Sequence, residues 1–306
     1  MDFDVIIIGG GPAGLTAAVY ALRSGHSVAV LEGTGFGGQM LLAHEIENYP
    51  GFVRISGVDL ADAMTEQARA LGVQFLYQNA LSVVPLEKGF SVHTDSQTLQ
   101  ARSVIVASGT KRRELGVPGE KEFLGRGVSY CAVCDGRFFK GMDVAVVGGG
   151  NTAVGDALYL ASFCRSVTLI HRRNAFRADK VLLDRLEKLS NIRLELNARV
   201  IAVQGSARME SLELECNGKE KKTVSAGGVF IAVGSVPENS FLTDIPSLSL
   251  DEAGYIVTDE RCRTNVPGLF ASGDIRAMQL RQIATAAADG AIAGTEASEY
   301  ADTFLF

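Results

Sequence analysis

The stretch Gly9-Gly10-Gly11-Pro12-Ala13-Gly14, directly after the apolar run Val5–Ile8, decides the fold of this chain. An apolar run that ends at a GxGxxG turn and continues into helix-forming residues predicts a strand, a phosphate-binding turn and a helix. Residues 5–22 carry no charge, but the glycines and the proline in their middle would interrupt a membrane-spanning helix. The stretch therefore predicts the opening of a dinucleotide-binding unit.

A second copy of this pattern lies further along the chain. Gly148, Gly150 and Ala153 repeat the spacing after the apolar run Val144–Val147. Each copy reads as strand, glycine turn, helix and strand, and the short apolar runs after it recur in the same order. After the first copy we expect a meander of residues 73–77, 81–84 and 90–94, and after the second a similar series that opens at residues 192–196. The chain is therefore expected to contain two related domains.

The expected fold class is α/β, with two Rossmann-like dinucleotide-binding domains, each a three-layer unit with a parallel sheet plus a β-meander. The segment after the second copy starts no third copy, since it holds a short strand near residue 270 and an Ala-rich helix from Gln282. We expect it to complete the first domain, with the second domain inserted between joints at residues 111–118 and 234–239. The predicted domains are residues 1–113 with 241–306, and residues 114–240.

Composition limits the classes of partner and the compartment. The net charge of −6 suggests no general affinity for nucleic acid or for acidic membrane surfaces. The first strand begins too early to leave room for a signal peptide. Five cysteines in 306 residues do not suggest a disulfide scaffold, which fits a reducing compartment. We expect a cytoplasmic protein.

The residue that ends the second strand of each copy distinguishes the two sites. The first copy has Glu32 there, and a carboxylate suits the hydroxyls of a ribose. The second has His171, followed by Arg172 and Arg173, with Arg177 close behind. An arginine cluster binds a 2′-phosphate through charge-assisted hydrogen bonds, whereas a carboxylate repels it. We expect FAD or NAD at the first site and NADPH at the second, unless His-Arg-Arg is only a solvated basic turn.

Cys131 and Cys134 form a lone Cys-x-x-Cys pair between the two glycine turns, and Asp135 follows at once. Such a pair is either half of a zinc site or a redox dithiol. A closed zinc site needs four ligands, yet the other three cysteines are scattered singly and the chain has only four histidines. We therefore expect a redox pair without a metal, in which Asp135 carries the proton that thiolate chemistry gains and loses. The other three cysteines are expected to be inert.

With these residues the chain resembles the low-molecular-weight thioredoxin reductases, essentially from end to end. The residues that carry the resemblance are Gly9–Gly14, Gly37-Gly38-Gln39, Glu47-Asn48-Tyr49-Pro50-Gly51, Cys131-Ala132-Val133-Cys134-Asp135-Gly136, Gly148–Ala153, His171-Arg172-Arg173, Phe176-Arg177, Gly273-Asp274 and Arg281-Gln282. The Cys-Ala-x-Cys-Asp-Gly segment is the most specific of them. Two departures are Gly155, where an acidic residue is usual, and the segment of residues 276–280.

The resemblance implies FAD in the first domain and NADPH in the second. It implies that Cys134 lies next to the flavin, that Cys131 attacks the disulfide of the partner, and that Asp135 is the acid or base. The expected contacts to the first cofactor are Gly9, Gly11, Pro12, Ala13, Gly14, Glu32, Gly38, Gln39, Asn48, Gly109, Gly273, Asp274, Arg281 and Gln282. The expected contacts to the second are Gly148, Gly150, Asn151, Thr152, Ala153, His171, Arg172, Arg173, Arg177 and Gly234.

The expected function is NADPH-dependent reduction of the thioredoxin disulfide through FAD and the Cys131–Cys134 dithiol, by a homodimer. The dithiol and the NADPH site fall in one inserted domain and cannot share one flavin face, so the resemblance implies that this domain swings about its joints. Alternatives are a flavin disulfide reductase that serves another redoxin or peroxiredoxin system or uses ferredoxin as donor, an NADPH oxidase or ferredoxin–NADP reductase, and a non-enzymatic nucleotide-binding protein. The dithiol argues against the oxidase, and the arginine cluster argues against ferredoxin as the electron donor.

Overall fold

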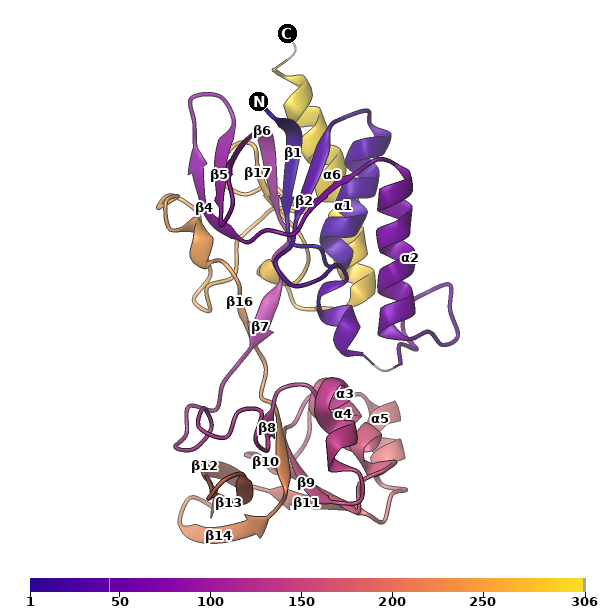
Figure 1. Cartoon of the computed structure of the whole chain (residues 1–306), viewed down its shortest axis with the longest axis vertical. Coiled ribbons are helices and arrows are strands. Elements are labelled where there is room, and N and C mark those ends of the chain that lie inside the picture. Colours follow the sequence, from indigo (N-terminus) through magenta and orange to yellow (C-terminus); the bar gives the residue numbers. More distant parts are fainter. Residues whose placement is uncertain (44, 305–306) are drawn as a thin grey trace. The chain divides into compact units, whose positions relative to one another are not determined.

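The computed structural model describes residues 1–43 and 45–304, and the chain divides into two compact units. The first unit comprises Met1–Lys111 and Val236–Phe306, and the second comprises Arg112–Ser235. Each unit is built on a sheet with parallel strands, and the second unit interrupts the chain of the first (Figure 1). The predicted fold class, with one dinucleotide-binding domain inserted into another, is confirmed.

A seven-stranded sheet forms the centre of the first unit. Its order is β3-β2-β1-β6-β5-β4, with β17 on the second half of β6. The parallel strands are β1 (Phe3–Ile8), β2 (Val28–Leu31), β3 (Gln74–Leu76), β6 (Thr98–Val106) and β17 (Leu269–Ala271), and the antiparallel ones are β4 (Ala80–Pro85) and β5 (Phe90–Thr94). Val5, Ile6 and Ile7 are fully buried, because both faces of β1 are covered, as is usual for parallel sheets.

The meander of the first unit differs from the prediction. The sequence predicts residues 73–77 as its first strand, but β3 pairs in parallel with β2 at the edge of the sheet. The antiparallel part consists of β4, β5 and the first half of β6. A short apolar run indicates a strand without indicating its partner, because edge strands of either kind use the same residue types. The same correction applies to residues 192–196 of the second unit, which pair in parallel with residues 167–171.

Three helices of the described chain, α1 (Pro12–Arg23), α2 (Gly57–Ala70) and α6 (Ile283–Asp302), lie side by side along the sheet of the first unit (Figure 1). Small residues let α6 approach α1 closely. A Cβ added to Gly290 would lie 2.2 Å from the carbonyl oxygen of Ala13, so no larger residue fits there. Short 3-10 turns complete the unit: η1 (Gly38–Leu42), η3 (Ser240–Leu242) and η4 (Gly273–Ile275).

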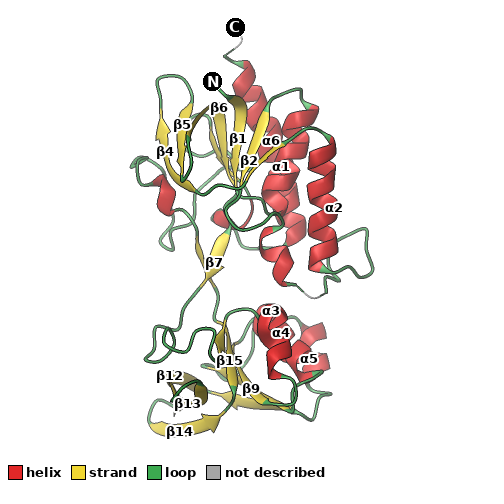
Figure 2. Cartoon of the chain, in the orientation of Figure 1, coloured by secondary structure: helices red, strands yellow, loops and turns green. Residues whose placement is uncertain are grey.

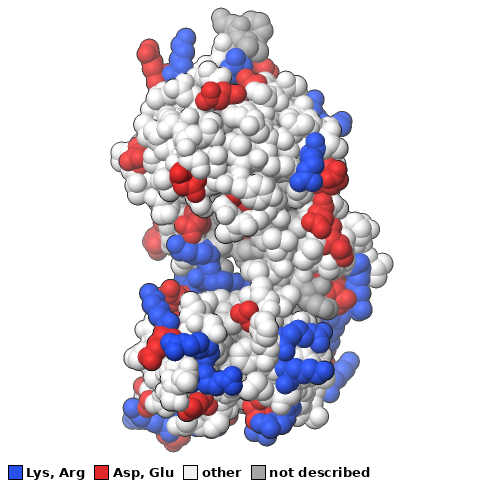
Figure 3. All heavy atoms as spheres, in the orientation of Figure 1, with Lys and Arg blue, Asp and Glu red and all other residues white. Residues whose placement is uncertain are grey.

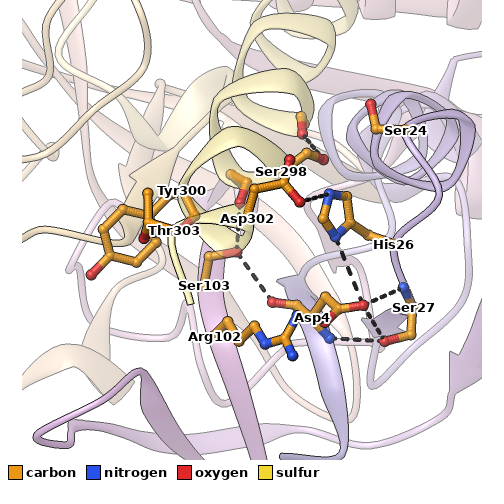
Figure 4. Close-up of polar contacts among 12 residues, drawn as sticks. Asp4, Ser24, His26, Ser27, Arg102, Ser103, Ser298, Tyr300, Asp302 and Thr303 are labelled. Atoms are coloured by element: carbon orange, nitrogen blue, oxygen red, sulfur yellow. Dashed lines mark hydrogen bonds and ion pairs between the residues drawn. The ribbon is translucent and has the colours of Figure 1, made fainter. Parts of the chain in front are cut away.

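A polar cluster anchors the end of α6 to the start of the sheet (Figure 4). The Asp4 carboxylate accepts hydrogen bonds of 2.8 Å from both the backbone N–H and the hydroxyl of Ser27, and it pairs with Arg102 at 2.6 Å. The buried ring of His26 lies between Asp4 and Asp302, with its nitrogens 3.8 and 3.5 Å from their carboxylate oxygens. The last turn of α6 is thereby held beside β1 and β2.

The second unit repeats the plan with a five-stranded parallel sheet of order β11-β10-β9-β15-β8. Figure 2 shows its helices on one face and a three-stranded antiparallel sheet, β12-β13-β14, on the other. The strands are β8 (Val128–Ser129), β9 (Asp143–Gly148), β10 (Ser166–His171), β11 (Ile192–Leu196), β12 (Ala198–Gly205), β13 (Met209–Cys216), β14 (Glu220–Ser225) and β15 (Gly228–Ala232). The helices are α3 (Ala132–Asp135), η2 (Gly136–Phe139), α4 (Asn151–Ala161) and α5 (Lys180–Leu186). Separate apolar cores fill the two sides of the five-stranded sheet, which makes three layers.

Two chain segments join the units, and they pair with each other as strands β7 (Thr110–Arg112) and β16 (Ser235–Pro237). A glycine in the left-handed region precedes each strand, Gly109 with φ of 65° and Gly234 with φ of 107°. A side chain is disfavoured at such φ values, and an added Cβ at either glycine would meet no atom within 4 Å. Backbone conformation, and not crowding, therefore explains these two glycines.

Candidate functional site

The first glycine turn joins β1 to α1 and has no room for side chains at two of its positions. A Cβ on Gly9 would lie 2.3 Å from the carbonyl oxygen of Ala107, and one on Gly14 would lie 1.9 Å from that of Gly9. At Gly11 the added Cβ would meet only the Cα of Gly38, at 3.9 Å, so space remains in front of the helix start. A helix N-terminus with open space before it fits a pyrophosphate.

Glu32 lies directly beyond β2 and is held beside this turn. Its Oε2 accepts the N–H of Gly10 at 3.0 Å, and its Oε1 accepts the N–H and the hydroxyl of Thr34, both at 2.9 Å. Both carboxylate oxygens are therefore fixed next to the glycine turn. A carboxylate at this position can accept hydrogen bonds from ribose hydroxyls, as the sequence predicts.

The structure brings together predicted first-site residues that lie far apart in the sequence. Asn48 donates from Nδ2 to Oε1 of Gln282 at 3.0 Å. Gln39 donates to the carbonyl and the hydroxyl oxygen of Thr110, next to Gly109, at 2.9 and 2.8 Å. These pairs lie in the first unit with the glycine turn, although up to 234 residues separate their members.

Asp274 and Arg281 form a second group in the same unit. The Nε of Arg281 donates to the carbonyl oxygen of Asp274 at 3.3 Å, and its guanidinium lies 3.9 Å from the ring centre of Tyr255. Burial raises the pKa of Asp274, while the charge of Arg281 opposes that rise. Gly273 approaches the glycine turn, since its added Cβ would lie 2.8 Å from the Cβ of Ala13. Sequence reasoning missed Tyr255, because nothing in the local pattern marks it.

The second glycine turn joins β9 to α4 and repeats the close contacts of the first. A Cβ on Gly148 would lie 2.2 Å from the carbonyl oxygen of Ala232, and one on Gly149 would lie 2.2 Å from the ring of His171. At Gly150 an added Cβ would meet nothing within 4 Å, which again leaves space at the helix start. The turn fits a second pyrophosphate.

The start of α4 is fixed by a pair of hydrogen bonds that the sequence did not predict. Asn151 donates from Nδ2 to the Asp179 carboxylate at 2.8 Å, and its Oδ1 accepts the N–H of Asp179 at 2.7 Å. The N–H of Arg177 also donates to the carbonyl oxygen of Gly149 at 2.7 Å. The segment that carries the arginine cluster is therefore attached to the second glycine turn.

Arg172, Arg173 and Arg177 have exposed side chains beside this turn. Their charges reach the buried ring of His171: burial lowers the pKa of His171, and the three arginines lower it further. Within residues 1–43 and 45–304, no carboxylate forms an ion pair with any of the three. Lys and Arg side chains are spread over the drawn face of the second unit (Figure 3). An exposed, unpaired arginine group fits a phosphate.

Cys131 and Cys134 form a disulfide at the start of α3, with their Cα atoms 5.4 Å apart. Cys131 is the N-cap residue of α3, and its sulfur accepts the N–H of Cys134 at 3.1 Å. Cys134 is exposed and Cys131 is half-buried in the structure. The Asp135 carboxylate accepts the hydroxyl of Ser129 at 2.6 Å, a contact that the sequence did not predict. The dithiol pair is therefore formed and within reach of solvent.

The other cysteines are not paired. Cys164 and Cys262 are buried, and burial raises the pKa of Cys164 to about 11 and that of Cys262 to about 12. Both thiols are thus protonated at neutral pH. Because the thiolate is the reactive form of cysteine, neither is expected to react. In the part of the chain that the structure describes, no three His, Cys, Asp or Glu side chains are grouped to hold a metal ion. None of the described helices is both long and apolar enough to cross a membrane.

Comparison with known proteins agrees with these features. The family model of the pyridine nucleotide-disulphide oxidoreductases matches residues 3–290. A thioredoxin reductase of Treponema pallidum is 43% identical over 304 residues, which cover 99% of this chain and 98% of the relative. One from Listeria innocua is 45% identical over 98% of this chain and 94% of its own. The crystal structure of Lactococcus lactis thioredoxin reductase, 40% identical, matches with a TM-score of 0.96 over 98% of this chain and 99% of that one. The chain belongs to the pyridine nucleotide-disulphide oxidoreductase family, as a member similar to the thioredoxin reductases.

Proposed function

We propose that this chain reduces the disulfide of thioredoxin with electrons from NADPH, which pass through FAD and the Cys131–Cys134 pair. The observation that carries the proposal is the closed Cys131–Cys134 disulfide in a chain with two glycine turns, one of them bordered by unpaired arginines. Two dinucleotides and one dithiol are the components of an electron relay from a soluble donor to a protein disulfide. FAD and NADPH supply the hydride chemistry when they are bound.

The first unit binds FAD in this proposal. The backbone of the Gly9–Gly14 turn and the start of α1 bind the pyrophosphate, and Glu32 accepts the ribose hydroxyls. Gln39, Asn48, Arg281 and Gln282 orient the flavin, and Asp274 contacts its linker. The paired positions of Asn48 and Gln282, 3.0 Å apart, support a shared role for them.

The second unit binds NADPH in this proposal. The turn from Gly148 to Ala153 receives the pyrophosphate, with Asn151 and Thr152 at the start of α4. Arg172, Arg173 and Arg177 bind the 2′-phosphate, since they are exposed and have no acidic partner among the described residues. His171 lies buried under Gly149 and sets the position of the turn.

Cys131, Cys134 and Asp135 reduce the partner protein. The Cys131 thiolate attacks one sulfur of the thioredoxin disulfide and breaks that bond, which gives a mixed disulfide and a thioredoxin thiolate. The Cys134 thiolate then attacks the Cys131 sulfur, re-forms the Cys131–Cys134 bond and releases the second thioredoxin thiolate. Two electrons leave the dithiol, and its two protons end on the thioredoxin sulfurs. Asp135 holds a proton between these steps.

We further propose that the enzyme is a homodimer. A cavity of about 340 Å³ lies among α1, α2 and α6 of the first unit, lined by apolar residues such as Val19 and Met64 and by polar ones such as Thr16 and Gln67. Tyr20 and Ile292 remain 45% and 38% exposed on the same helices. A second copy of the chain would cover this surface. Light scattering on the purified protein in solution should give twice the chain mass. A monomeric mass that does not depend on concentration would contradict the proposal.

We also propose a cytoplasmic location. The three unpaired cysteines suit a reducing compartment, where free thiols persist. Cell fractionation with an antibody against the chain tests this, and recovery from the secreted fraction would contradict it.

The main test is NADPH consumption by the purified protein with oxidised thioredoxin from the same organism. The proposal expects fast turnover that Cys134→Ser abolishes. If NADPH reduces the flavin but addition of thioredoxin gives no turnover, the proposed electron path within the chain is retained and thioredoxin is the wrong partner. If NADPH does not reduce the flavin, the assignment of the second site is wrong, and ferredoxin becomes the donor to test.

A further inference from the structure

Ser129 is the last residue of β8 and lies two positions before Cys131. Ser129 is 4% exposed, and β8 is held in the parallel sheet, where Ser129 pairs with Phe230 of β15. The dithiol and Asp135 belong instead to a short helix beyond the sheet. Ser129 is thus a rigid neighbour of a small, partly exposed redox segment.

The Ser129 hydroxyl connects Asp135 to Cys131. Its oxygen lies 2.6 Å from Oδ2 of Asp135 and 3.0 Å from the backbone nitrogen of Cys131. The hydroxyl donates its single proton to Asp135 while it accepts the N–H of Cys131. A third contact, to the carbonyl oxygen of Cys131, is longer at 3.3 Å. The hydroxyl therefore uses both its donor and its acceptor capacity in the redox segment.

Asp135 is held by this hydroxyl and by its own backbone. The N–H of Asp135 donates to the carbonyl oxygen of Cys131 at 3.1 Å. Together with the Ser129 contacts, this bond closes a ring of hydrogen bonds through three residues. No other side chain in residues 1–43 and 45–304 forms a hydrogen bond or an ion pair with the Asp135 carboxylate. The orientation of that carboxylate thus depends on one serine.

We propose that Ser129 is a positioning residue for thiol–disulfide exchange: its hydroxyl fixes the Asp135 carboxylate relative to the Cys131–Cys134 pair. The inference rests on the proposed function, in which Asp135 carries the protons of the exchange. A carboxylate that can rotate away from the sulfurs serves this purpose poorly, since a misplacement of about 1 Å can cost about a hundredfold in rate. Loss of the hydroxyl also leaves the Cys131 N–H without its acceptor.

The test is a double-mutant cycle in the full-length holoenzyme. Wild type, Ser129→Ala, Asp135→Asn and the double variant are reduced beforehand, and the single-turnover rate of thioredoxin reduction is measured. Ser129→Ala should lower that rate about tenfold to a hundredfold in the wild-type background. In the Asp135→Asn background it should change the rate by about twofold or less, because the two residues act as one unit. An equal loss in both backgrounds, or no loss in either, would overturn the inference.

Three controls separate positioning from a general structural role. Ser129→Thr keeps a hydroxyl and should restore most of the rate. Tyr130→Phe removes the neighbouring hydroxyl, which donates to Glu120 at 2.7 Å and does not touch Asp135, and it should leave the rate unchanged. NADPH-dependent reduction of ferricyanide draws electrons without the dithiol and should be equal in wild type and Ser129→Ala. If Ser129→Ala fails to bind flavin, Ser129→Gly takes its place in the cycle.

A second readout separates failure of this inference from failure of the proposed function. Dithiothreitol opens the Cys131–Cys134 disulfide by exchange in the reverse direction and requires no thioredoxin. The same four variants should show the same non-additive pattern in this opening rate. If wild type does not reduce thioredoxin, the proposed function fails, and the dithiothreitol cycle still decides the role of Ser129.

Discussion

A few charged residues distinguish two otherwise similar glycine turns, among them Arg172, Arg173 and Arg177. Both glycine turns are crowded at their first glycine, Gly9 or Gly148, and open at the glycine before the helix, Gly11 or Gly150. The difference lies in the residues after the second strand of each unit, a fixed carboxylate at Glu32 in one and exposed arginines in the other. At the scale of the residue, charge therefore distinguishes the two turns, and the proposed assignment of NADPH to the second turn rests on it.

Replacement of Arg172 and Arg173 by alanine should weaken the binding of NADPH much more than the binding of NADH. A hydrogen bond to a charged group contributes about 1.5–3 kcal/mol, which corresponds to about tenfold to a hundredfold in Kd for each arginine. NADH lacks the 2′-phosphate and should bind almost as before. Flavin reduction at increasing concentrations of each nucleotide measures both constants.

Arg199→Ala provides the matched control for this experiment. Arg199 is an exposed arginine of the same unit, but it pairs with Glu215 at 2.9 Å on the antiparallel sheet. It should leave both nucleotides unaffected. Equal losses of NADPH and NADH in the Arg172 and Arg173 variants would contradict the 2′-phosphate assignment.

At the scale of the element, glycines in the two helices after the turns have opposite roles. Gly14 lies in the first turn of α1, where a Cβ would meet the carbonyl oxygen of Gly9 at 1.9 Å. Gly155 lies in the middle of α4, where a Cβ would meet nothing within 4 Å. The first glycine is required by the close approach of strand and helix. The second only weakens its helix.

We predict that Gly155→Ala stabilises the protein by about 0.5–1 kcal/mol, the usual gain from alanine over glycine inside a helix. Gly14→Ala should destabilise it and release FAD, because the backbone at the turn must move. Chemical denaturation and the flavin absorbance of the purified variants measure both effects. A Gly155→Ala protein that is less stable than wild type would show that the glycine is needed for a contact.

The anchor at the end of α6 should depend on pH through Asp4. Burial raises the pKa of Asp4, but the Ser27 hydrogen bonds and the Arg102 charge outweigh burial, so the pKa lies below its ordinary value of 3.8. The ionised carboxylate therefore stabilises the fold at neutral pH. As the pH falls, the unfolded chain takes up the proton first and this stabilisation is lost.

Asp4→Asn should accordingly be less stable than wild type at pH 7, and the difference should shrink between about pH 5 and pH 3. Urea unfolding at a series of pH values measures the difference. A difference that stays constant across the acid range would show that the charge of Asp4 does not contribute.

At the scale of the whole molecule, the sites of the proposed electron path lie in different units. The dithiol and the proposed NADPH turn both belong to Arg112–Ser235, whereas the proposed flavin site belongs to the first unit. The units are joined by β7 and β16, each preceded by a glycine with positive φ. Two short connections of this kind are typical of a hinge. Turnover should therefore require the second unit to move as a body.

We predict that a thioether cross-link between one cysteine introduced in each unit stops NADPH-to-thioredoxin turnover and leaves FAD bound. The link is made while Cys131–Cys134 is oxidised, so that the dithiol does not react. Variants with either cysteine alone, treated in the same way, should keep their activity. Undiminished turnover in the linked protein would contradict the motion.

The sequence by itself determined the features that depend on local chemistry. Residue type and spacing alone mark several of these features: Gly9 and Gly148, the Cys131–Cys134 pair, and the arginines after His171. The repeated layout also predicted the inserted second unit, because each copy carries its own strand, turn and helix.

Only the tertiary structure decided which distant groups meet. It placed β3 beside β2 in parallel, joined Asn48 to Gln282 at 3.0 Å, and set the Ser129 hydroxyl between Asp135 and Cys131. These contacts depend on strand pairing, register and helix packing, which involve residues far apart in the chain. Short apolar runs and single polar residues are compatible with many such pairings, so the packed fold has to select one.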